Sequence, residues 1–169
     1  MTKASVGPLS RPTRVDRLIG ARPATVEVEA TPEECVALAR DFRIPAIRDL
    51  KGTFRLTGTL ARLSVAGMVE AVVTQVCTVT LEPFEAPLTS EVEVDFSDGA
   101  ESLGADPDSI DVPDPIVNGQ IDFGALTAEA VALGLDPFPR IPGAEFETVT
   151  VGDDESPFAV LKKPPANDV

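Results

Sequence analysis

Strict alternation of apolar and polar residues marks the strands of this chain. Residues 88–96 show it best, because Leu, Val, Val and Phe on one face alternate with Thr, Glu, Glu and Asp on the other. Residues 24–30 carry the same pattern, as do residues 53–60 and 68–81, with Cys77 and Leu81 on the apolar face of the last stretch. A period of two places one set of side chains on each face, which predicts half-buried strands. Short connections between the later strands favour antiparallel pairing.

Two stretches with apolar residues three and four positions apart predict helices. Thr31-Pro-Glu-Glu34 opens the first, since it combines an N-cap, a proline at the first helical position and the Thr-x-x-Glu capping box. The buried stripe of this helix consists of Cys35, Leu38, Ala39 and Phe42. Residues 123–133 predict the second helix, with Asp122 as its N-cap. Residues 156–161 predict one further helical turn.

Together these elements predict an α+β protein. Its core is a curved, mainly antiparallel sheet, with a small closed barrel as an alternative, and it carries a packed helix and a C-terminal helical extension. The length of 169 residues suits one domain. The expected organisation is a basic N-terminal arm at residues 1–23, an α+β core at 24–97, an acidic flexible loop at 98–120, a helix with a proline-rich extension packing on the core at 121–162, and a disordered tail at 163–169.

The charge of −14 changes the picture, because it is unevenly spread. Residues 1–22 hold five basic residues and one acidic residue, whereas residues 98–169 hold fifteen acidic residues and three basic ones. Nucleic-acid binding depends on neutralising phosphates, so most of this chain would repel RNA and attract a basic protein. Solubility alone is the simpler explanation of the acidity. The basic arm supplies the candidate RNA contacts Arg11, Arg14, Arg17 and Arg22.

Several kinds of chemistry have little support in the sequence. The chain has no His and two cysteines, Cys35 and Cys77, so it cannot assemble a Cys/His zinc site, and we expect both thiols to be buried and free. Glu91, Glu93 and Asp95 share one strand face, as any solvent-facing strand would show. We therefore expect no catalytic, metal or cofactor site. The absence of a membrane-spanning run and of a signal-type apolar segment predicts a cytoplasmic protein.

One basic residue stands out in the acidic C-terminal half of the chain. Arg140 lies in a proline-rich stretch after the second predicted helix, directly behind Phe138 and Pro139. Aromatic and arginine side chains are enriched at interface hot spots, so these three residues are candidate partner contacts, with Phe158 as a fourth. The alternative is structural: Phe138 packs back onto the sheet, and Arg140 pairs with a local acid such as Asp136.

The chain also resembles a known family. The blocks that carry the resemblance occur in the family's order: Ser10-Arg-Pro12, Ala30-Thr-Pro-Glu-Glu34 with Ala39-Arg40, QVCTVTLEP at 75–83, Gly119-Gln-Ile-Asp122 with Ala128-Glu129, LDPFPR at 135–140 with PGAEF at 142–146, and SPFAVL at 156–161. They are similar to the YceD family, the large ribosomal RNA subunit accumulation proteins. The forms VCTVTLEP and LDPFPRIPGAEF resemble the alphaproteobacterial branch. Where some members have Cys-x-x-Cys, this chain has Cys77-Thr-Val-Thr80, which leaves no case for a metal there.

The resemblance implies a bacterial, non-enzymatic factor that supports 23S rRNA synthesis, processing or accumulation and assembly of the large ribosomal subunit. Implied partners are a large-subunit precursor, a basic ribosomal protein and, through the N-terminal arm, 23S rRNA. No membrane and no small-molecule substrate is implied. Two alternatives remain open: a metal-dependent enzyme acting on rRNA, and a general acidic chaperone for basic proteins.

Overall fold

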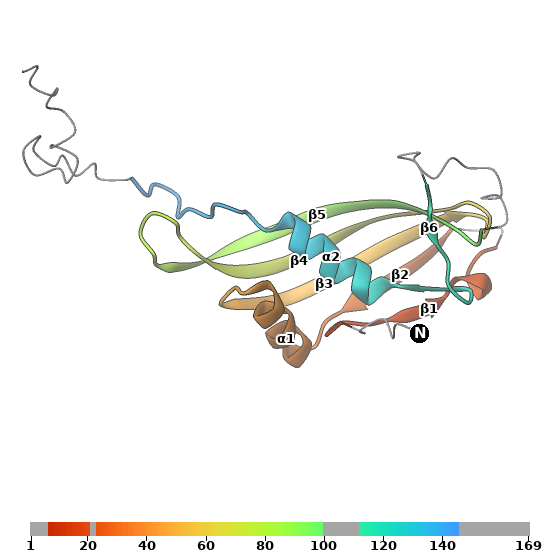
Figure 1. Ribbon diagram of the computed structural model, residues 1–169, viewed down its shortest axis with the longest axis horizontal. Coiled ribbons are helices and arrows are strands. Elements are labelled where there is room, and N and C mark those ends of the chain that lie inside the picture. The colour runs from red at the N-terminus through yellow and green to blue at the C-terminus, as the bar shows by residue number, and fades with distance from the viewer. Residues whose placement is uncertain (1–6, 21–22, 100–111, 146–169) are drawn as a thin grey trace, which may run out of the picture.

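The structure is a computed structural model that describes residues 7–20, 23–99 and 112–145. Within these ranges the main sheet has the strand order β2-β3-β4-β5-β6 (Figure 1). All neighbouring pairs are antiparallel except β5 and β6. The strands are β2 (Ala24–Glu29), β3 (Ala46–Gly58), β4 (Leu63–Val76), β5 (Pro83–Ser97) and β6 (Asp114–Pro115). The predicted α+β class and curved antiparallel sheet are confirmed, but the sheet is open, so the barrel alternative is wrong.

Three of the predicted strands have other bounds than their patterns suggested, and β5 begins at Pro83, five residues before the predicted start. β3 begins at Ala46, and its register with β4 shifts between Arg48 and Lys51, which is a β-bulge. β4 stops at Val76, although apolar alternation continues for five residues more. The hairpin loop follows there, with Leu81 in the left-handed region at φ 60° and 76% exposed. The expectation that Leu81 faces the core is therefore wrong.

The predicted helices form with the expected caps. α1 (Pro32–Phe42) has the complete capping box, and α2 (Phe123–Gly134) has Asp122 as its N-cap. Figure 1 shows α2 lying across the strands of the sheet, with α1 beside β3. Between helix and sheet, the rings of Phe123 and Phe54 pack with centroids 5.3 Å apart, and both side chains are fully buried. This layer is the hydrophobic core, which Val65, Val69, Val73, Leu88 and Val131 extend.

The N-terminal segment is part of this core from residue 9 onward. β1 (Pro12–Arg14) pairs antiparallel with β7 (Gln120–Asp122), and the short 3-10 helix η1 (Val15–Arg17) follows. Leu9 is 1% exposed and Val15 is fully buried. The segment predicted as a basic arm thus contributes two side chains to the core. The predicted acidic loop likewise contains β6 and the buried Ile116, while residues 100–111 of that loop lie outside the described ranges.

The opposite face of the sheet carries no covering element among the described residues. Along β5 this face presents Glu91, Glu93 and Asp95, which are exposed. The central strand β4 adds Met68, at 42% exposure. The described helices include none that is long and apolar enough to cross a membrane.

Candidate partner-binding site

The loop after α2 is fixed to the β4–β5 hairpin through its backbone. The carbonyl of Pro139 accepts hydrogen bonds from the Thr78 amide at 2.8 Å and from its hydroxyl at 3.2 Å. The Asp136 carbonyl accepts a hydrogen bond from the buried side-chain amide of Gln75 at 2.9 Å. Gln75 is 7% exposed and lies on the apolar face of β4, so this bond satisfies a polar group that burial would otherwise penalise. The loop therefore has a defined path across the hairpin.

This path leaves two of the candidate contact side chains in solvent. Phe138 is 71% exposed, so the alternative in which it packs onto the sheet is not what the structure shows. Arg140 is exposed and forms no ion pair with any residue in the described ranges. The carboxylate of Asp136 accepts the Phe138 amide at 2.8 Å. Pro139 is half-buried, and Phe158 lies outside the described residues. The contact role of these residues stays a prediction.

Cys77 joins the hairpin to the same loop. Its Sγ accepts hydrogen bonds from the backbone amides of Thr80 and Ile141, each at 3.4 Å, and its side chain is fully buried as expected. Burial raises the pKa of the thiol, but the hydrogen bonds outweigh burial and lower the pKa to about 7. The sequence predicted the burial of Cys77 but not its hydrogen bond from the Ile141 amide, because Ile141 lies 64 positions away.

Two grooves follow β5 on the side of α2. The first, about 420 Å³, lies between residues 84–89 of β5 and residues 134–142, and Arg140 contributes to its lining. The second, about 260 Å³, lies between residues 90–94 of β5 and α2. The described residues that line the second groove include four acidic residues and no Lys or Arg, together with apolar residues of α2: Glu91, Glu93, Asp114, Glu129, Leu126, Ala130 and Leu133. The side chains of Glu91 and Glu93 alternate onto the opposite face of β5, so these two residues border the groove at the strand edge.

The second groove is both apolar and acidic. Leu133 is 79% exposed on α2, beside the half-buried Leu126. Such a surface suits a ligand that combines apolar and cationic side chains. Sequence reasoning missed this groove, because Asp114 and Glu129 come from segments that only the tertiary fold brings to β5. The one signal in the sequence was Leu133, an apolar residue at the end of the second predicted helix.

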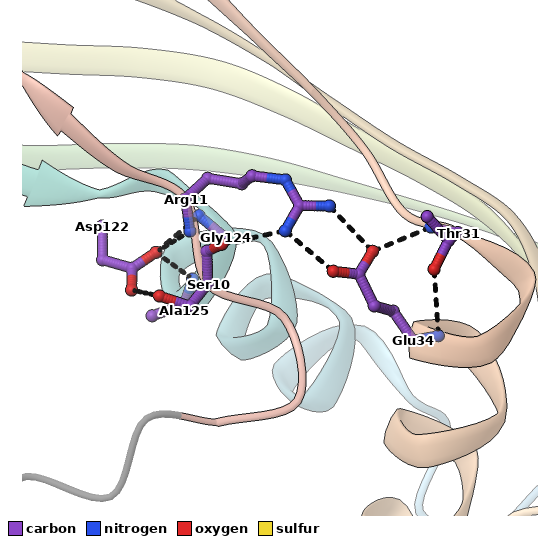
Figure 2. Close-up of polar contacts among 7 residues, drawn as sticks. All are labelled: Ser10, Arg11, Thr31, Glu34, Asp122, Gly124 and Ala125. Atoms are coloured by element: carbon purple, nitrogen blue, oxygen red, sulfur yellow. Dashed lines mark hydrogen bonds and ion pairs between the residues drawn. The ribbon is translucent and has the colours of Figure 1, made fainter.

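The candidate RNA-contacting arginines are arranged differently. Arg11 forms a two-pronged ion pair with Glu34 of α1, with both N···O distances at 2.8 Å (Figure 2). The bond from Arg11 and the backbone amide of Thr31 lower the pKa of Glu34 to about 2. The Arg11 amide also donates to Asp122 at 2.7 Å. This arginine therefore links the N-terminal segment to α1 and to the start of α2.

Asp122 completes that junction. Its carboxylate accepts the Ser10 hydroxyl at 2.5 Å and the amides of Gly124 and Ala125 at 3.0 Å (Figure 2). Burial raises the pKa of Asp122, but these hydrogen bonds together lower it below its ordinary value. The carboxylate thus caps α2 and anchors the N-terminal segment at once.

The remaining arginines of the N-terminal segment lie at its surface. Arg14 pairs with Asp16 at 2.6 Å, and Arg17 is exposed. Arg22 lies outside the described residues. Of the three candidate RNA contacts that the structure describes, Arg11 and Arg14 each bind a carboxylate of the chain itself, and Arg17 forms no ion pair within the described residues.

Within the described residues, no group of three or more Cys, Asp or Glu side chains is placed to hold a metal ion. The family model described as "Large ribosomal RNA subunit accumulation protein YceD" matches residues 65–163. This range contains both grooves along β5 and the loop that carries Phe138 and Arg140. No curated protein and no solved structure matches the chain.

Proposed function

The chain belongs to the YceD family of large ribosomal RNA subunit accumulation proteins, and we propose that it acts without catalysis, by binding a basic ribosomal protein in the bacterial cytoplasm. Through that binding it supports 23S rRNA accumulation and assembly of the large subunit. The observation that carries this proposal is the acid-lined groove between β5 and α2, which lies inside the matched range.

Charge favours a protein partner over a nucleic acid. The groove and the adjoining edge of β5 carry four acidic residues and no cation among the described lining residues, and the net charge of the chain is −14. A surface of this sign repels phosphates and speeds the approach of a positively charged protein. Most ribosomal proteins are basic because they neutralise rRNA phosphates, so the negative field of this chain attracts them.

A direct rRNA contact through the N-terminal segment is the second part of the proposal. Arg17 is exposed and carries it best, since Arg11 and Arg14 are engaged with Glu34 and Asp16. Substituting Arg17 and Arg22 together by Gln is then expected to weaken association with RNA, with no effect on association with a purified basic protein.

The test is depletion of the protein, followed by the 23S to 16S rRNA ratio and a sucrose gradient of the same lysates. We expect less 23S rRNA and a tagged chain that sediments with large-subunit precursors. A complementing chain with Glu91→Gln, Glu93→Gln and Glu129→Gln should fail to restore the ratio. Its matched control, Glu27→Gln with Glu33→Gln, removes exposed charge away from the groove and should restore it.

Other outcomes would assign the chain to another class. An unchanged rRNA ratio with promiscuous binding to many basic proteins would make it a general acidic chaperone. Metal-stimulated cleavage of rRNA by the purified chain, lost in the Gln variants, would make it an enzyme. Either result would overturn the proposal.

A further inference from the structure

β5 presents a long unpaired edge. It runs from Pro83 to Ser97, and one side pairs with β4 from Pro83 to Phe96. On the other side, β6 pairs only with Phe96 and Ser97. Among the described residues, no strand pairs with positions 83–95 on that side. Free strand edges of this length are templates for pairing with another chain.

The backbone groups that face this edge can be identified from the register. Ser97 turns its carbonyl toward β6, where it accepts the Ile116 amide at 2.8 Å. Pairing between β4 and β5 runs without a shift from Phe96 to Pro83, so the alternation of hydrogen-bonding directions continues along the strand. Residues 89, 91, 93 and 95 therefore direct their amides and carbonyls to the free edge. Pro87 belongs to the same set, and its missing N–H costs no bond to β4.

The side chains along this edge lack counter-charges. Glu91, Glu93 and Asp95 face Met68, Ala66 and Ser64 of β4, and within the described ranges none of the three forms an ion pair. On the opposite face, the groove between β5 and α2 offers Leu126 and Leu133. A strand added to the edge would place its side chains alternately beside these two surfaces.

We propose that β5 binds an extended basic segment of a partner protein as an added β-strand, with apolar residues in the groove and Lys or Arg beside Glu91 and Glu93. Backbone hydrogen bonds to residues 89–95 hold the segment, and alternation of apolar and cationic residues selects it. The identity of the partner as a ribosomal protein rests on the proposed function, whereas the binding mode rests on the edge and the groove.

The charge of the chain itself argues against two other occupants. A second copy paired through the same edge would bring its own Glu91 and Glu93 against these carboxylates, and like charges on facing strands are destabilising. The two long segments outside the described ranges are also acidic: residues 100–111 carry four acidic groups and no basic one, and residues 146–169 carry five acidic groups and two lysines.

The test uses the full-length protein and a fluorescein-labelled peptide that alternates Val with Lys and Arg over eight residues. We expect binding by fluorescence anisotropy, and a loss of about tenfold in affinity for Glu91→Pro, which removes an outward amide while keeping the bonds to β4. Glu91→Gln with Glu93→Gln should weaken binding by about threefold. The matched control Glu27→Gln, on the opposite edge strand β2, should bind as the natural chain does.

A modified peptide keeps the test independent of how well the proline variant folds. N-methylation of every second residue removes the peptide's donors on one side, so one of the two methylation frames should abolish binding to the unmodified protein. A block peptide of equal composition, with its cations at one end, should bind at least about fivefold more weakly, because it cannot place cations and apolar groups on separate faces.

Three outcomes would overturn the inference. Equal binding of the methylated and unmethylated peptides would exclude strand addition. Strong hydrogen-exchange protection of the outward amides of residues 89, 91, 93 and 95 in the free monomer would mean that another segment of the chain occupies the edge. A dimer in sedimentation that Glu91→Pro dissociates would make a second copy the occupant. The peptide assay is separate from the rRNA measurement, so loss of peptide binding with a normal depletion phenotype refutes the binding mode alone.

Discussion

Neutralising Glu34 should destabilise the fold in a pH-dependent way. The substitution Glu34→Gln removes the charge that pairs with Arg11, while its amide oxygen can still accept the Thr31 amide in the capping box. The variant therefore isolates the ion pair that joins the N-terminal segment to α1. Its neighbour Glu33→Gln is the control, because Glu33 is exposed and forms no ion pair within the described residues.

The size of the effect follows from the pKa of Glu34 and its exposure. The fall from 4.5 to about 2 corresponds to an upper limit of about 3.4 kcal/mol. The side chains of Arg11 and Glu34 are 37% and 20% exposed, and Gln keeps part of the cap, so solvent screening and the retained bond reduce this limit. We expect Glu34→Gln to lower the free energy of unfolding by about 1–2 kcal/mol at pH 7.

The pH dependence has a definite sign. The pKa of Glu34 is lower in the folded chain than in the unfolded one, so its stabilisation is fully present above pH 4.5 and is lost as the pH falls toward 2. The difference between the natural chain and Glu34→Gln should therefore shrink to roughly half or less by pH 3. Urea unfolding followed by far-UV circular dichroism measures it, since the chain has no Trp or Tyr for fluorescence. No difference at pH 7, or an equal difference at pH 3, would refute this account.

Three further predictions concern other parts of the fold. Gly124→Ala would place its Cβ 2.7 Å from the Arg11 backbone nitrogen, so it should cost about 1–3 kcal/mol in urea unfolding and expose residues 9–14 to hydrogen exchange; unchanged protection there would contradict the clash. Cys77 should form its thiolate with a midpoint near pH 7 by ultraviolet absorbance, moving to about 8.5 in urea, and a folded midpoint above 8 would show that its two amide donors do not act. Phe138→Ala should change stability by less than about 0.5 kcal/mol, because the ring is 71% exposed, yet lower cosedimentation with large-subunit precursors; normal cosedimentation would remove Phe138 from the contact surface.

Sequence patterns predicted those helices and strands whose ends are set by neighbouring residues. The cap of α1 could be predicted because Thr31 and Glu34 lie three positions apart, and the second helix because Asp122 directly precedes it. The end of β4 could not, because Cys77 and Leu81 continue the apolar alternation into a hairpin loop. A turn that happens to preserve a period of two has the same pattern as a strand.

Features that depend on contacts between distant residues could not be predicted from the sequence. Leu9 and Val15 are isolated apolar residues in a basic stretch, and their burial depends on β7 and α2, more than a hundred positions away. The candidate site shows the same division. Phe138 and Arg140 were found by residue type, but the free edge beside Glu91 and Glu93 requires knowing which strands pair, and alternation does not encode the pairing partner.

The junction between Ser10, Arg11 and Asp122 also orders events during synthesis. Ser10 and Arg11 lie 112 and 111 positions before Asp122. They can therefore form these hydrogen bonds only after the strands between them have been translated. Contacts this distant form late in folding, after the local hairpins. Until residue 122 emerges, Ser10 and Arg11 have no Asp122 to bind, and β1 has no β7 to pair with. Residues 9–15 therefore reach their positions in this core only after residue 122 has been translated, so any intermediate that forms earlier lacks this junction.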